Sequence, residues 1–236
     1  MSAYIHSPQA AESARELVYI KVQRQKILLG KYAKKLSIPD AEPRTISGLM
    51  LFEARVAKTY WRGFRLLMPP SVGFTGRKPR KEDIGNHLLD IGYHHLTNVV
   101  EKLLLKHSVS TALGLFHVAR NADSAPLAYD MVEMFRADIV DAETLRFFRL
   151  KKKKNIEALE PEYIARFLHR VNTRLERKYY LKEFKGCHSY RYYMELQILK
   201  FIKAVNHAEV FSPLHLPTRH ESRCHGRLTP ALEVLN

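Results

Sequence analysis

EDIGNHLLDIGYHHLTNVVEKLLLKH, residues 82–107, carries apolar residues at helical spacing and predicts one long helix, which Gly85 and Gly92 interrupt without necessarily breaking. The same spacing recurs along nearly the whole 236-residue chain, and the alternation of apolar and polar residues that marks strands is almost absent. The sequence therefore predicts an all-α fold. It predicts one helical domain over residues 1–211, followed over residues 212–236 by a disordered tail with prolines, many polar residues and no apolar periodicity.

Prolines and capping residues bound the other predicted helices. Thr45 or Ser47 is placed to cap the second helix, which Pro69 ends, and Pro161 opens a later helix at a first-turn position. The predicted helical segments are residues 7–36, 49–68, 82–107, 126–136, 141–154, 161–181 and 189–207.

The formal net charge is +15 and the pI is about 9.8. Self-repulsion between so many positive charges is hard to explain unless the surface binds an anionic partner. Nucleic acid is the first candidate for this partner and an anionic membrane is the second. The chain has no apolar run near the roughly 18 residues that span a bilayer, and its start lacks a basic-then-apolar signal sequence. Its two cysteines, Cys187 and Cys224, lie far apart and suggest no disulfide scaffold. We expect a soluble, cytoplasmic protein that binds nucleic acid and no membrane.

Three segments place acidic or imidazole side chains among apolar neighbours. Glu53 lies in GLMLFEARVAKTYW and His117 ends GLFH, while Asp130 and Glu133 lie three residues apart on one face of the predicted helix PLAYDMVEMFR. Each has an ordinary explanation. Glu53 could pair with a neighbouring basic residue, His117 could be a hydrogen-bonded core histidine, and Glu133 could form a salt bridge with Arg136.

Taken together, two carboxylates and one imidazole suit a divalent cation that accepts oxygen and nitrogen ligands, and Mg²⁺ or Mn²⁺ fits best. In a strongly basic protein such an ion suggests phosphodiester chemistry, because the metal would polarise the phosphate and lower the pKa of an attacking hydroxyl.

Five blocks stand in order along the chain: ARELVYIKVQRQKILL (14–29), LFEARVAKTYWRGF (51–64), DIGNHLLDIGYHHL (83–96), VSTALGLFH (109–117) and PLAYDMVEMFRADIVD (126–141). In these five blocks the sequence resembles the CRISPR-associated integrase-endonuclease family of spacer acquisition. The resemblance covers about residues 14–211 and implies the helical, C-terminal catalytic domain of that family.

The resemblance implies that Glu53, His117 and Glu133 bind the metal. It places Asp130 beside them as a supporting catalytic acid and Arg120 near the scissile phosphate. In the family, the 3′-hydroxyl of a captured double-stranded DNA fragment attacks a phosphodiester at the edge of the CRISPR repeat array, in a transesterification that Mg²⁺ or Mn²⁺ would assist. Because the nucleophile is the DNA end, no Ser, Cys or Tyr of the protein need become covalently bound.

The chain departs from the family at its start. Family members begin with a β-rich domain that builds the homodimer and contacts the small partner protein "Cas two", and here the first catalytic-domain helix comes almost at once. The starting Met favours a naturally short member over an excised domain. We expect a homo-oligomer, a dimer or tetramer, that integrates alone, with dependence on the partner as the alternative.

Basic clusters are the expected DNA contacts. They are the loop residues Arg77, Lys78, Arg80 and Lys81, the run Lys151, Lys152, Lys153 and Lys154, and Arg120 and Arg136 near the site. Such contacts supply affinity and salt dependence, although a lysine run is often only a solvated face.

Two other classes of protein stay open. One is a DNA-binding architectural protein that kept the fold and lost catalysis, and the other is a helical membrane-surface or partner-binding protein with no metal dependence. Glu53, Asp130 and Glu133 favour the enzyme, because carboxylates beside a DNA path repel phosphate unless a metal intervenes.

Overall fold

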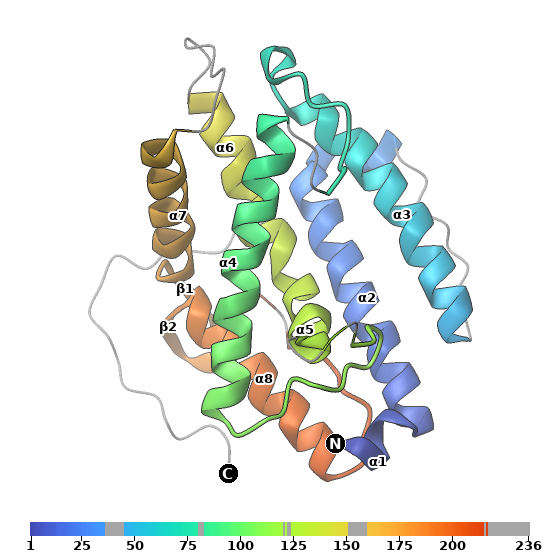
Figure 1. Ribbon diagram of the computed structural model, residues 1–236. Coiled ribbons are helices and arrows are strands. Elements are labelled where there is room, and N and C mark those ends of the chain that lie inside the picture. The colour runs from blue at the N-terminus through green and yellow to red at the C-terminus, as the bar shows by residue number, and fades with distance from the viewer. Residues whose placement is uncertain are drawn as a thin grey trace.

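The structure is a computed structural model of the chain, and it describes residues 1–35, 45–79, 83–119, 121, 124–150, 160–214 and 216. Its helices are α1 (Ser2–Ile5), α2 (Pro8–Leu29), α3 (Ile46–Leu67), α4 (Ile84–Lys106), α5 (Pro126–Arg136), α6 (Ala142–Leu150), α7 (Pro161–Leu175) and α8 (Tyr190–Asn206). Short 3-10 turns lie at Gly30–Lys35, Pro70–Val72 and Lys182–Phe184, and a π-helical turn at Ala137–Asp141 joins α5 to α6. The predicted all-α class is confirmed (Figure 1).

Local side-chain chemistry sets the helix starts. The Ser7 hydroxyl accepts the backbone N–H of Ala10 at 3.3 Å ahead of α2, and the Thr45 hydroxyl accepts that of Gly48 at 3.0 Å ahead of α3. Pro161 opens α7, where its missing N–H costs no hydrogen bond. The predicted cap at Thr45 and the predicted helix start at Pro161 are therefore confirmed.

Helix α4 runs unbroken through the middle of the molecule, with α6 and α7 on one side and α2 and α3 on the other (Figure 1). Gly92 allows this close packing, since a Cβ built there would lie 2.5 Å from Val140 Cγ1 and 3.1 Å from a ring carbon of Phe167. The glycine that interrupts the apolar pattern is thus a contact point between α4, the π-helical turn and α7.

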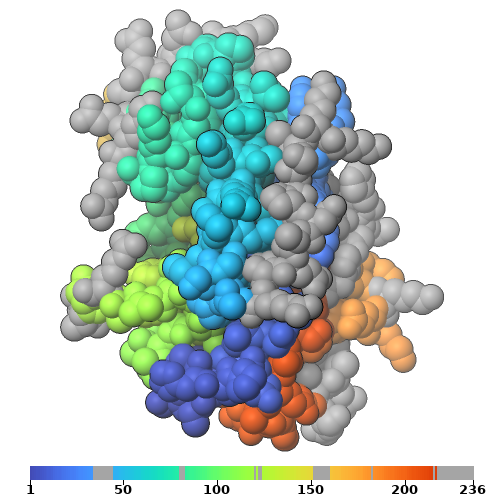
Figure 2. All heavy atoms as spheres, turned by 90° about the vertical axis from the view of Figure 1, so that its right-hand side faces the viewer, coloured from blue at the N-terminus to red at the C-terminus, as the bar shows by residue number. Residues whose placement is uncertain are grey.

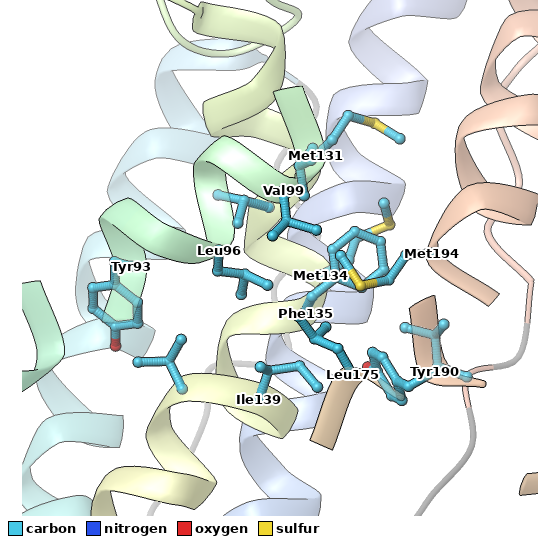
Figure 3. Packing of buried hydrophobic residues seen from close by; sticks show 14 of the residues in the cluster. Tyr93, Leu96, Val99, Met131, Met134, Phe135, Ile139, Leu175, Tyr190 and Met194 are labelled. Carbon is cyan, nitrogen blue, oxygen red and sulfur yellow. The ribbon is translucent and has the colours of Figure 1, made fainter. Parts of the chain in front are cut away.

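The core is built around α5, which packs between α2 and α4. Figure 3 shows Leu96 and Val99 of α4 facing Met134 and Phe135 of α5, with Tyr190 of α8 beyond them. All five side chains are buried. Because α5 is enclosed by apolar contacts, any polar group that it carries toward a cavity is held in a fixed place.

The predicted helix over residues 161–181 is too long. It ends at Leu175, and β1 (Lys178–Leu181) pairs antiparallel with β2 (Gly186–Ser189). Tyr179 and Leu181 are buried and Tyr180 between them is exposed. This alternation suits a strand that covers a core on one face, and tyrosine favours strands, so tertiary packing overrides the helical pattern.

The packed domain extends past the predicted boundary at residue 211. Gln197 donates to the carbonyl of Leu214 at 2.7 Å and accepts its N–H at 2.9 Å, and Arg24 donates to the carbonyl of Leu216 at 2.8 Å. Leu216 is buried. The rest of the predicted tail, residues 215 and 217–236, lies outside the described residues. No described helix combines the length and apolar character that crossing a bilayer requires.

Candidate metal and DNA site

Side chains from three helices and one loop line a single cavity of about 60 Å³. Lys21 comes from α2, Glu53 from α3, Asp130 and Glu133 from α5, and His117 from the chain between α4 and α5. Figure 2 shows the outer face of this region, where α3 runs down the middle and the chain after α4 lies beside its lower half. The structure thus brings together the three acids and the one imidazole predicted from the sequence.

Lys21 joins the two glutamates. Its Nζ lies 2.5 Å from Glu53 Oε1 and 2.8 Å from Glu133 Oε2. Burial opposes the charge of this lysine, but the opposite charges of Glu133 and Glu53 outweigh it and raise the pKa of Lys21. An ammonium ion therefore lies between the carboxylates of α3 and α5.

Glu133 is held ionised from a second side as well. Arg136, one helical turn further along, forms an ion pair with Glu133 Oε1. Burial favours the neutral acid, yet Arg136 and Lys21 outweigh it and lower the pKa of Glu133 to about 2. The salt bridge to Arg136 that we set against a metal role is thus present, and it leaves Oε2 directed to Lys21.

Asp130 fixes the position of His117. Its buried carboxylate accepts the backbone N–H groups of Leu115, Phe116 and His117 at 2.5, 3.1 and 3.0 Å. The same carboxylate lies 2.7 Å from His117 Nδ1, while the imidazole is 38% exposed. A carboxylate that binds one ring nitrogen leaves the other available as a ligand, the usual arrangement behind a metal-binding histidine. Gly114 belongs to this turn, because a Cβ there would lie 2.6 Å from Asp130 Oδ2.

The types of side chain in the cavity suit a divalent cation. The cavity offers two glutamates on facing helices that both pair with Lys21, and an imidazole oriented by a carboxylate; Glu133 Oε2 is buried, with Lys21 Nζ 2.8 Å away. In the described part of the chain, no three His, Cys, Asp or Glu side chains lie close enough to hold a metal as they stand. Lys21 takes up the space between the two glutamates.

A buried network that the sequence did not reveal stands behind Arg136. The guanidinium carbon of Arg136 lies 4.2 Å from the ring centre of Tyr93, whose hydroxyl donates to Asp141. Tyr60 donates to the same carboxylate at 2.5 Å. Burial raises the pKa of Asp141 to about 6, although both tyrosine hydroxyls act in the opposite direction. The π-helical turn places Asp141 here, and such turns often accompany functional sites.

The predicted DNA-binding residues divide into described and undescribed ones. Arg77 forms an ion pair with Asp90, donates to Asn86 at 3.1 Å and lies 5.3 Å from the ring centre of Tyr93, so it anchors its loop to α4. The backbone N–H of Lys78 donates to Asn86 at 2.8 Å. Arg136 is described too, and its guanidinium pairs with Glu133 and lies over Tyr93. The remaining predicted contacts lie outside the described residues: Arg80, Lys81, Arg120 and Lys151 to Lys154.

Comparison with known proteins supports the architecture. The sequence model of the family described as CRISPR associated protein Cas1 matches residues 1–166. A CRISPR-associated endonuclease Cas1 of Saccharolobus solfataricus is 31% identical over 153 residues, which cover 58% of this chain and 43% of that protein. This chain therefore spans less than half the length of that relative.

Two solved structures share the fold. One is a casposase bound to an integration product, with a TM-score of 0.72 and 17% identity, covering 94% of this chain and 66% of that one. The other is a partial Cas6-RT-Cas1–Cas2 complex, with a TM-score of 0.74 and 19% identity, covering 89% of this chain and 70% of the matched chain. With a family match over more than two thirds of its residues, the chain belongs to the Cas1 family of CRISPR-associated proteins.

Proposed function

We propose that this chain is a metal-dependent DNA integrase of CRISPR adaptation, which joins the 3′-hydroxyl ends of a captured DNA fragment into the repeat array by transesterification. The observation that carries the proposal is the convergence of Glu53, Glu133 and the Asp130-held His117 on one cavity. Three acids in a protein of charge +15 would repel a DNA strand unless a cation accompanied them.

Glu53, His117 and Glu133 would hold Mg²⁺ or Mn²⁺, which would polarise the scissile phosphate and lower the pKa of the attacking hydroxyl. Asp130 orients the imidazole through Nδ1 and fixes the turn that carries it. Arg136 keeps Glu133 ionised as a ligand. Lys21 holds the glutamates of α3 and α5 next to each other, and its ammonium must leave that place when a divalent ion arrives.

The proposed partners are double-stranded DNA and further copies of this chain. The casposase neighbour is bound to an integration product, and another neighbour is in complex with Cas2. Assembly as a dimer or tetramer that works alone, and assembly with a Cas2-type subunit, are both compatible with these relationships. Joining assays with and without that subunit separate the two.

A catalytically inactive DNA-binding protein is the second candidate, and the ion pairs of Lys21 favour it. They neutralise Glu53 and Glu133 without any metal, so the acids need not signify catalysis. The two candidates differ in one property, since only the integrase requires a divalent cation to form new phosphodiester bonds.

The test is joining of a labelled duplex with free 3′-hydroxyls to supercoiled plasmid in Mg²⁺ or Mn²⁺, followed on a gel. We expect joining by the wild type and none by Glu53→Gln or His117→Ala. Glu162→Gln is the matched control, because Glu162 is an exposed α7 acid in an ion pair with Arg166. Joining that survives Glu53→Gln or His117→Ala would contradict the ligand assignment. A wild type that binds DNA but never joins it, with or without Cas2, would support the inactive protein.

A further inference from the structure

Away from the metal cavity, four arginines line a second hollow of about 220 Å³ between α6, the end of α7 and β1. They are Arg146 and Arg149 of α6, and Arg174 and Arg177 at the end of α7. The remaining lining residues are Ala142, Leu145 and Tyr179. We call this feature the arginine hollow. No acidic residue lines it among the described residues, so all the charged residues described in its lining are cationic.

One buried carboxylate behind the wall holds part of the cluster in place. Glu143 is 1% exposed and pairs with Arg174 at 3.1 Å, with Arg170 at 3.0 Å and more distantly with Arg146 at 3.8 Å. A single negative charge cannot balance the four guanidinium groups of the lining together with Arg170. The cluster therefore keeps an excess of positive charge that solvent must screen or an anionic ligand must neutralise.

Several side-chain donors of the hollow have no acceptor among the described residues. The side chains of Arg149 and Arg177 form no ion pair or hydrogen bond with another described residue. Arg174 is 7% exposed, and its Nε is buried without a hydrogen-bond partner. Unpaired buried donors and clustered like charges both cost stability, so residues of this kind are expected where an anion completes them.

The chemistry of the donors selects the anion. Guanidinium groups are planar, always charged and carry forked N–H donors that match the oxygens of a phosphate. Tyr179 also lines the hollow, and the volume of the hollow exceeds what one water needs. A phosphate group of a nucleic-acid backbone fits this combination of charge, donor geometry and openness.

We infer that the arginine hollow binds a backbone phosphate of DNA at a place separate from the metal cavity. None of its lining residues lines that cavity. Figure 1 shows α6 and α7 on the side of α4 opposite to α3. The inference rests on the proposed action on DNA, and it assigns the hollow a positioning role: it would anchor a DNA segment outside the reacting end.

The test compares two double variants that each remove two positive charges. Arg149→Gln/Arg177→Gln changes the hollow at its two unpaired arginines, whereas Lys102→Gln/Lys203→Gln changes exposed lysines of α4 and α8. Binding of a fluorescent DNA duplex is measured by anisotropy in EDTA over a range of salt concentrations. We expect the arginine variant to weaken binding about tenfold and to lower the slope of log K against log salt by about 1 to 2, and the lysine variant to change both far less.

Equal losses in the two double variants would overturn the inference, because net charge alone would then explain binding. A second arm adds inorganic phosphate and follows thermal unfolding. If phosphate stabilises the wild type but not the arginine variant, and DNA affinity is the same in both, the hollow binds free phosphate and the DNA assignment is overturned. Since these measurements need no metal, hollow-dependent DNA binding by a protein that joins no DNA would refute only the proposed function.

Discussion

Replacing Lys21 by methionine separates the structural role of this lysine from the proposed metal site. The change removes the ammonium between Glu53 and Glu133 and keeps much of the buried stem. The two carboxylates then face each other without a cation between them, and Glu133 keeps only its ion pair with Arg136. Breaking a buried ion pair costs about 3–5 kcal/mol. Lys21 is 14% and Glu53 24% exposed, so we take the lower end, about 3 kcal/mol.

The assay is thermal unfolding in EDTA and in millimolar Mn²⁺. For a chain of this size about 1 kcal/mol shifts Tm by about 2–4 °C, so Lys21→Met should unfold about 6–12 °C below the wild type in EDTA. An ion that binds only the folded state adds about 2.7 kcal/mol at a hundredfold excess over its Kd. Because the variant has no internal competitor for the site, Mn²⁺ should raise its Tm by more than it raises that of the wild type.

Lys106→Met is the matched control, because Lys106 pairs with Glu195 at 2.6 Å on the surface and is 61% exposed. Such a pair contributes about 0–1 kcal/mol, so Tm should change little and the response to Mn²⁺ should equal that of the wild type. If Mn²⁺ stabilises Lys21→Met no more than the wild type, then Lys21 does not occupy the place of a metal, and the reasoning fails.

Three other outcomes follow from the same structure. Asp130→Asn should weaken Mn²⁺ binding about 10- to 100-fold by calorimetry, because it loosens the hold on His117, and unchanged affinity would remove Asp130 from the site. Burial raises the pKa of Asp141 to about 6, above its ordinary 3.8, so the folded state binds the proton more tightly and the free energy of unfolding should fall by about 2 kcal/mol between pH 4 and pH 6. Urea unfolding of Asp141→Asn should show a smaller fall over that range, and an equal fall would contradict the assignment. Gly92→Ala should destabilise the fold by about 1–3 kcal/mol in urea unfolding, since its Cβ would lie 2.5 Å from Val140, and a neutral result would show that α4 can shift.

Sequence patterns predicted the helices well where local chemistry bounds them. The cap at Thr45 and the first-turn Pro161 act within one turn of the chain, so they can be recognised without a structure. The hairpin of β1 and β2 could not be predicted in this way. Tyr179 and Leu181 continue the apolar spacing of α7, and only their packing against the core decides that they form a strand.

The candidate site, like the fold, has a part that the sequence predicted and a part that only the structure shows. Residue type and family resemblance pointed to Glu53, His117, Asp130 and Glu133, and all four line one cavity. The role of Lys21 depends on ion pairs with residues 32 and 112 positions further along the chain, which no local pattern reports. One signal was present, since Lys21 lies one turn after Leu17 on the apolar face of its helix, where an unpaired lysine would be costly.

Different interactions hold the His117 side and the glutamate side of the cavity in place. This difference affects how a metal ion could bind there. The His117 half is fixed by three backbone N–H groups that Asp130 accepts, and those bonds do not depend on any cation. The glutamate half is held by the charge of Lys21 between α3 and α5. A divalent ion would therefore find the imidazole already oriented and would need to displace the singly charged ammonium of Lys21 from the glutamates. Such an exchange disturbs the packed helices less than filling an empty pair of carboxylates, because a cation faces both glutamates before and after it.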